Sequence, residues 1–141
     1  MRELIVQADG GSRGNPGTAG SGAVVLDADT GEVLAEIGVY VGFATNNVAE
    51  YHGMLAGLRQ AFSIDDRASI HVQMDSKLVV EQMSRRWKIK HPDMQVLAKT
   101  AFELIGMRTV TFEWIPREQN ALADALANRA MDAEDDFLIL P

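Results

Sequence analysis

Short apolar runs separated by polar or glycine-rich segments fill the first third of the chain. The runs at 2–8, 21–28 and 32–42 predict strands, and residues 29–31 between the last two predict a hairpin turn. Residues 10–20, which are rich in glycine, predict a loop between the first two strands. The chain is therefore expected to open with three strands in antiparallel succession.

The apolar spacing changes to a helical period after residue 45. Residues 46–62 predict a helix that Thr45 or Asn46 caps, and residues 68–74 predict a fourth strand. The later expected elements are a short helix from Ser76 to about Met83, a helix from Pro92 to about Gly106, a strand at 109–115, and a helix from Asn120, its N-cap, to about Met131. The order βββαβααβα predicts an α/β fold with a five-stranded mixed sheet flanked by helices.

The boundaries of the domain follow from this order of elements. Residues 1–132 are expected to form one domain, and 133–141 to form an acidic and apolar tail. Such a tail is compatible with the start of a linker to another domain.

The first and fourth strands both end in Gln-x-Asp. Period two places Gln7 and Asp9 on one face of the first strand, and Gln73 and Asp75 on one face of the fourth. A helix precedes the fourth strand, so a crossover can bring this strand parallel to the first. Ligand sites form at the carboxyl ends of such strands, and two adjacent carboxylates need a compensating cation.

Two further acids are expected to face inward from helices. Glu50 lies one turn before Met54, and Asp124 adjoins the apolar stripe of the last helix. Acids are seldom buried unless they are paired or bound to metal. The nearby candidates for direct pairing are Lys77, Arg117 and Arg13. The alternative is that all four acids converge on metal ions, and oxygen-only ligands favour Mg²⁺ or Mn²⁺.

Composition narrows the class of protein. A length of 141 residues suits one domain, and the absence of Cys is typical of a reducing compartment, so we expect a cytoplasmic monomer. No apolar run approaches the ~20 residues of a membrane span. A net charge of −7 argues against nucleic-acid binding through bulk charge, although ions bound to the acids would reverse the local field.

Four motifs together resemble the ribonuclease H type 1 family. They are ADGGSRGNPG with Asp9, TNNVAEYHGMLAGL with Glu50, MDSKLVVEQM with Asp75 and WIPREQNALADALAN with Asp124, in the family's order and within residues 2–131. The resemblance implies a ribonuclease H-like fold in which these acids hold two Mg²⁺ ions, with Mn²⁺ as a substitute. It also implies a metal-dependent endoribonuclease that hydrolyses the RNA strand of RNA/DNA hybrids by in-line attack, leaving 5′-phosphate and 3′-hydroxyl ends.

The resemblance further implies a substrate groove that recognises the shape of a hybrid and reads its 2′-hydroxyls. The residues that match this groove are Gly10, Gly11, Ser12, Asn15, Thr45, Asn46 and Asn47. Thr45 matches a contact to a DNA phosphate. Phe43 stands where an arginine often begins this stretch, which argues against the family's DNA-phosphate pocket.

Two more segments depart from the family pattern. Many members have a basic protrusion, but this chain has only SRRWKIKHPDM, in which Trp87 is expected to pack or to stack on substrate. The cations that replace part of the protrusion are Arg85, Arg86, Lys88 and Lys90. The loop before Asp124 lacks the family's histidine, and Arg117 is the nearest replacement. Because a guanidinium does not give up its proton in proteins, Arg117 can hold a phosphate but cannot act as a base.

Two other functions compete with this prediction. The first is a non-cleaving module of the same fold that binds hybrid or RNA, and the presence of all four acids argues against it. The second is the chemistry of transposases, integrases or exonucleases, to which DGGSRGNPG and TNNVAEY do not belong. We therefore expect a hybrid-specific nuclease whose catalytic residues are Asp9, Glu50, Asp75, Asp124 and Arg117.

Overall fold

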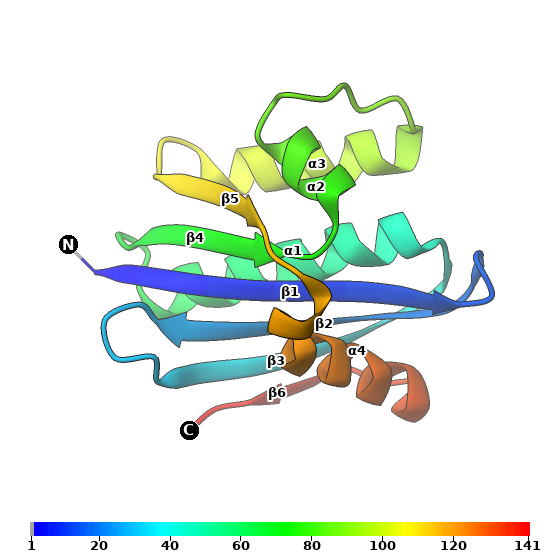
Figure 1. Cartoon of the computed structure of the whole chain (residues 1–141), viewed down its shortest axis with the longest axis horizontal. Coiled ribbons are helices and arrows are strands. Elements are labelled where there is room, and N and C mark those ends of the chain that lie inside the picture. Colours follow the sequence, from blue (N-terminus) through cyan, green and yellow to red (C-terminus); the bar gives the residue numbers. More distant parts are fainter. Residues whose placement is uncertain (1) are drawn as a thin grey trace.

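A six-stranded mixed sheet lies at the centre of the computed structural model, which describes residues 2–141 (Figure 1). The strands are β1 (Glu3–Arg13), β2 (Gly17–Asp27), β3 (Val33–Ala44), β4 (Ser69–Met74), β5 (Val110–Trp114) and β6 (Phe137–Ile139), in the spatial order β5-β4-β1-β2-β3-β6. The α/β class and the order of the first five strands are as predicted. The sixth strand is additional, because part of the predicted tail pairs with β3 through Gly38 and Phe137.

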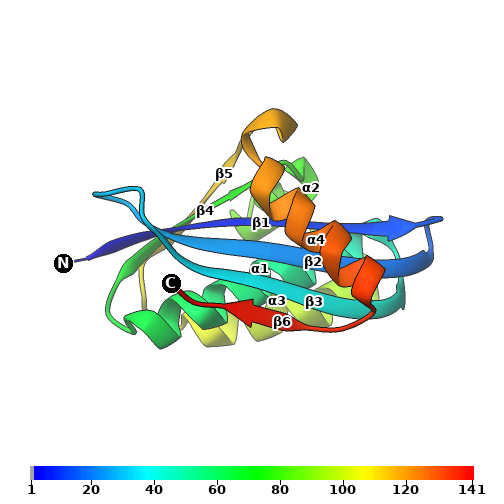
Figure 2. The ribbon, with the colours of Figure 1, turned by 90° about the horizontal axis from the view of Figure 1, so that it is seen from below.

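Helices cover both faces of this sheet. They are α1 (Asn46–Ile64), α2 (Lys77–Met83), α3 (Pro92–Ile105) and α4 (Ala121–Ala133), with a 3₁₀ turn at Arg117–Gln119. Figure 2 shows α1 and α3 on one face and α4 alone on the other. Thr45 caps α1 and Ser76 caps α2, each accepting a hydrogen bond from the backbone three residues later. In the part of the chain that the structure describes, no helix has the length and apolarity needed to cross a bilayer.

The prediction of a loop at 10–20 is wrong, because β1 and β2 continue as a paired hairpin through this segment. The ladder runs without a break from Asp9 opposite Gly22 to Arg13 opposite Thr18. Glycine serves helix packing here, since a Cβ at Gly10 would lie 2.3 Å from the Ala49 backbone in α1. A Cβ at Gly22 would lie 2.2 Å from a backbone oxygen of α4, so both helices pack against bare backbone.

The predicted parallel pairing of the first and fourth strands is confirmed. The register places Gln7 beside Gln73 and Ala8 beside Met74, so Asp9 and Asp75 follow in adjacent positions. However, Asp9 does not end its strand: β4 stops at Met74, whereas β1 continues to Arg13. Beyond the end of β4, β1 has no neighbouring strand on that edge among residues 2–141. Residues from both faces of the sheet can meet there.

Candidate active site

Asp9 lies in the middle of β1 and is almost fully buried. One carboxylate oxygen accepts a hydrogen bond of 2.9 Å from the backbone N–H of Gly10. Burial raises the pKa of Asp9 to about 8, with a further contribution from the charge of Asp75 and a smaller one from Asp124. A carboxyl group perturbed by burial and by like charges is typical of a functional site.

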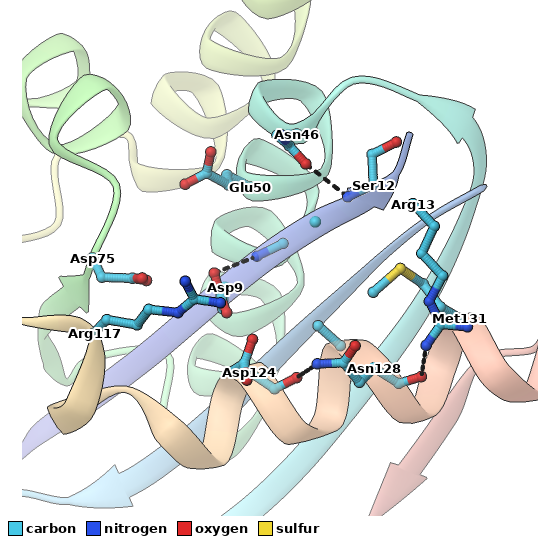
Figure 3. A pocket seen from close by; sticks show the side chains of 13 residues that line it. Asp9, Ser12, Arg13, Asn46, Glu50, Asp75, Arg117, Asp124, Asn128 and Met131 are labelled. Carbon is cyan, nitrogen blue, oxygen red and sulfur yellow. Dashed lines mark hydrogen bonds between the residues drawn. The ribbon is translucent and has the colours of Figure 1, made fainter. Parts of the chain in front are cut away.

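Glu50 reaches the same region from α1. Burial raises the pKa of Glu50 to about 7; a hydrogen bond with Ser76 opposes the shift, and the charge of Asp75 adds to it. Figure 3 shows Glu50 on one side of β1 and Asp124 of α4 on the other, with Asp9 and Asp75 between them. The structure thus brings the four acids to one region from β1, α1, α4 and the residue that follows β4.

A hydrogen-bond network holds Asp75 at the end of β4. Its Oδ1 accepts a bond of 2.8 Å from the side-chain amide of Asn120. The same amide nitrogen donates to the backbone oxygen of Ala8 at 2.9 Å. Asn120 is the N-cap residue of α4, as predicted, but its side chain makes no capping hydrogen bond, because its amide turns towards Ala8 and Asp75 instead.

The four acids line one cleft of about 380 Å³. Of the predicted substrate residues, Gly10, Gly11, Ser12 and Asn46 also line it, and Arg117 extends into it toward Asp9 (Figure 3). The lining residues that the sequence did not single out are Ala127, Asn128 and Met131, and Arg13 was considered there only as a candidate to pair with the acids.

A periodic signal for two of these residues exists in the sequence. Asn128 follows Asp124 by four residues on a helix, and Arg13 follows Asp9 by four residues on a strand, so each shares a face with its acid. The signal at Arg13 was hidden because the segment was predicted to be a loop. Arg13 forms an ion pair of 2.7 Å with Asp132, so it is not the direct partner of an acid of the cleft.

Four predicted substrate residues lie outside the lining of the cleft: Asn15, Thr45, Asn47 and Trp87. The Asn15 side chain accepts a hydrogen bond of 3.0 Å from the Asn46 backbone, and so acts on the cleft through its neighbour. Thr45 lines a separate, mainly apolar hollow that includes the exposed Phe43. Trp87 is 46% exposed in the segment between α2 and α3.

Two cations of the basic segment after α2 already interact with other side chains of the protein. The Arg86 guanidinium donates two hydrogen bonds, of 2.6 and 3.0 Å, to Glu81. The Arg85 guanidinium stacks 4.3 Å from the centre of the Phe102 ring. These contacts engage two of the four cations predicted to replace the protrusion.

The donor set of the cleft fits hard divalent cations. It consists of carboxylate oxygens, and the repulsion that raises the pKa of Asp9 is what a cation would relieve. Among residues 2–141, no three Asp, Glu or His side chains yet converge closely enough to hold an ion.

Known proteins with a similar sequence and fold share this architecture. A family model described as "Reverse transcriptase-like" matches residues 7–130. The bifunctional protein Rv2228c of Mycobacterium tuberculosis is 55% identical over 132 residues, which are 93% of this chain and 36% of that protein. This chain thus spans about a third of the length of this protein and of two further curated relatives with the same identity and coverage.

Two solved structures superimpose over nearly the whole chain. The N-terminal RNase H domain of Rv2228c from M. tuberculosis, solved as a fusion with maltose binding protein, has a TM-score of 0.89 and 54% identity, covering 94% of this chain and 96% of that one. LC11-RNase H1, solved in complex with an RNA/DNA hybrid, has a TM-score of 0.87 and 38% identity, covering 93% and 98%. The mixed sheet between α1 and α4 is thus of the ribonuclease H class. More narrowly, the chain belongs to the type 1 ribonuclease H family.

Proposed function

We propose that this chain is a metal-dependent endoribonuclease that hydrolyses the RNA strand of RNA/DNA hybrids. The observation that carries the proposal is the convergence of Asp9, Glu50, Asp75 and Asp124 on one cleft, with the pKa values of two of them raised to about 8 and about 7. The similarity to LC11-RNase H1, a structure that contains such a hybrid, supports this choice of substrate.

The four carboxylates would hold two divalent cations, Mg²⁺ or Mn²⁺. Bound there, such ions supply an activated water and stabilise the charge that develops on the scissile phosphate and the leaving oxygen. The carboxylates fix the ions relative to β1, because Asp9 belongs to a strand paired on both sides. This chemistry leaves products with 5′-phosphate and 3′-hydroxyl ends.

The wall of the cleft beside Asp9 suits the sugar of an RNA strand. Gly11 presents backbone without a side chain to this wall, so a ribose and its 2′-hydroxyl can approach closely, whereas the bare side of Gly10 packs against α1. The Asn46 side-chain oxygen is occupied by the Ser12 backbone N–H at 2.8 Å, which leaves its amide nitrogen to donate to substrate. Recognition then depends on sugar and backbone rather than on base sequence.

Arg117 provides a positive charge at the mouth of the cleft. Among residues 2–141, no carboxylate oxygen lies within 4.0 Å of its guanidinium nitrogens. The planar guanidinium of Arg117 matches the geometry of a phosphate, to which it can donate two parallel hydrogen bonds. Arg117 would therefore bind the substrate phosphate and assist the departure of product without transferring a proton.

The proposal is tested with RNA/DNA hybrid, duplex RNA, single-stranded RNA and duplex DNA, each labelled and incubated with and without Mg²⁺. We expect cleavage of the RNA strand of the hybrid alone, and only with the ion. Asp9→Asn is the matched control: it should reduce cleavage by more than about 100-fold, since the loss of even an outer partner of a ligand costs about 10- to 100-fold. Hybrid binding without cleavage by the wild type would instead favour a non-cleaving module.

A further inference from the structure

The Asn120 residue contacts the segments of three of the four acids. Its side-chain Nδ2 donates to the backbone oxygen of Ala8, directly before Asp9, and to Oδ1 of Asp75. Its backbone oxygen accepts a hydrogen bond of 3.1 Å from the N–H of Asp124. One residue at the start of α4 therefore ties together β1, the end of β4 and α4.

A role in stability alone explains these contacts poorly. Asn at this position ordinarily stabilises a helix by accepting a backbone hydrogen bond, and Asn120 makes no such cap. Its Oδ1 is buried and has no hydrogen-bond partner among residues 2–141, which is an unfavourable state for a polar atom. Within residues 2–141, the side chain thus makes neither a capping hydrogen bond nor any hydrogen bond through Oδ1, whereas its Nδ2 donates to Asp75 and to the backbone beside Asp9.

We infer that Asn120 is a positioning residue that sets the metal affinity of the cleft. The inference rests on the proposed function, since it assumes that Asp75 is a metal ligand. Asp9 and Asp75 repel each other, and without a donor Asp75 would turn toward water and away from the cluster. The amide holds one oxygen of Asp75 and leaves the other free. A group that orients a metal ligand in this way changes metal affinity about 10- to 100-fold when it is removed.

The test compares Asn120→Ala with Gln82→Ala, which removes a buried amide at a distance from the acids. Gln82 accepts a hydrogen bond of 2.7 Å from the Tyr51 hydroxyl and donates one of 3.2 Å to the backbone of Lys88. Mg²⁺ is titrated into each protein without substrate, and its Kd is measured by calorimetry. Both variants should melt at a lower temperature than wild type. Only Asn120→Ala should bind Mg²⁺ about 10- to 100-fold more weakly.

Equal Mg²⁺ affinity in the two variants would overturn the inference. A measurement on the wild type covers the case in which Asn120→Ala does not fold: the side-chain NH₂ resonances of Asn120 are followed by NMR during a Mg²⁺ titration. We expect these resonances to shift with the Kd that calorimetry gives for Mg²⁺ and the wild type, because Asp75, whose carboxylate accepts their hydrogen bond, becomes a metal ligand. Unchanged resonances would overturn the inference. Failure of the wild type to bind Mg²⁺ or to cut the hybrid is a separate outcome that contradicts the proposed function.

Discussion

Gly53 of α1 lies against the backbone of Asp9 in β1, so closely that a Cβ at Gly53 would come within 2.5 Å of the Asp9 carbonyl oxygen. This contact fixes the height of α1 above the strand, and with it the position of Glu50 one turn earlier in the helix. The acids from β1 and α1 thus share a cleft because the helix carries no side chain at the point of contact.

Gly53→Ala should therefore lower the free energy of unfolding by about 1–3 kcal/mol, because the added methyl meets backbone that cannot move aside easily. Gly11→Ala is the matched control, since its Cβ would meet only the end of the Met131 side chain at 3.9 Å. Urea unfolding of both variants measures the difference. Equal destabilisation of the two variants would show that the close approach of α1 to β1 is not what excludes a side chain at Gly53.

The stability of the metal-free protein should depend on Asp9 through pH. The pKa of Asp9 is raised to about 8 in the folded protein, mainly by burial, against 3.8 for the unperturbed group. The folded form keeps a proton that the unfolded chain releases, so the contribution of Asp9 to the free energy of unfolding falls as pH rises from about 4 to about 8.

Asp9→Asn removes this dependence, because an amide does not titrate. Near pH 4 the free energy of unfolding of the variant should hardly exceed that of the wild type. Near pH 9 it should exceed it by at least about 1–2 kcal/mol, since one unit of pKa shift corresponds to about 1.4 kcal/mol. The measurement is urea unfolding of both proteins in EDTA across this range. A difference that stays constant with pH would contradict the assignment of the raised pKa to Asp9.

Arg117→Ala should lower kcat for hybrid cleavage about 10-fold, because a free cation is removed from the mouth of the cleft. Its melting temperature should hardly change, since Arg117 is exposed and forms no ion pair among residues 2–141. Arg129→Ala is a suitable control, because this cation lies on α4, which follows the turn of Arg117, but stacks on Phe137, at 4.4 Å from the ring centre. A similar kcat in the two variants would contradict a role of Arg117 in cleavage.

Phe137→Ala should destabilise the domain by about 1–2 kcal/mol, less than a fully buried phenylalanine would. The ring packs on Gly38 of the neighbouring strand, where a Cβ would come within 2.1 Å of it. Leu140→Ala, at an exposed position beyond β6, should change stability by less than about 0.5 kcal/mol. Thermal unfolding distinguishes the two, and an unaffected Phe137→Ala would mean that β6 adds nothing to the fold.

The sequence by itself determined the order of the elements as far as α4, the mixed sheet and the four acids that the structure places at one cleft. Hydrophobic period is a local property, so the strands at Asp9 and Asp75 and the helices of Glu50 and Asp124 were visible without the fold. Period two also predicted common faces for Gln7 with Asp9 and for Gln73 with Asp75, and the parallel register sets Gln7 beside Gln73, so that the two acids follow in adjacent positions.

Only the tertiary structure decided what each segment pairs with. Residues 10–20 contain the glycine of a loop, yet they form a hairpin, because backbone hydrogen bonds and helices packed on both faces stabilise them. Phe137 became part of a strand because it covers Gly38, about a hundred residues earlier in the chain. The side chain of Asn120, at the N-cap position of α4, became a donor to Ala8 and Asp75 because these residues lie beside it. Each of these outcomes depends on partners distant in sequence, and a local pattern carries no information about such partners.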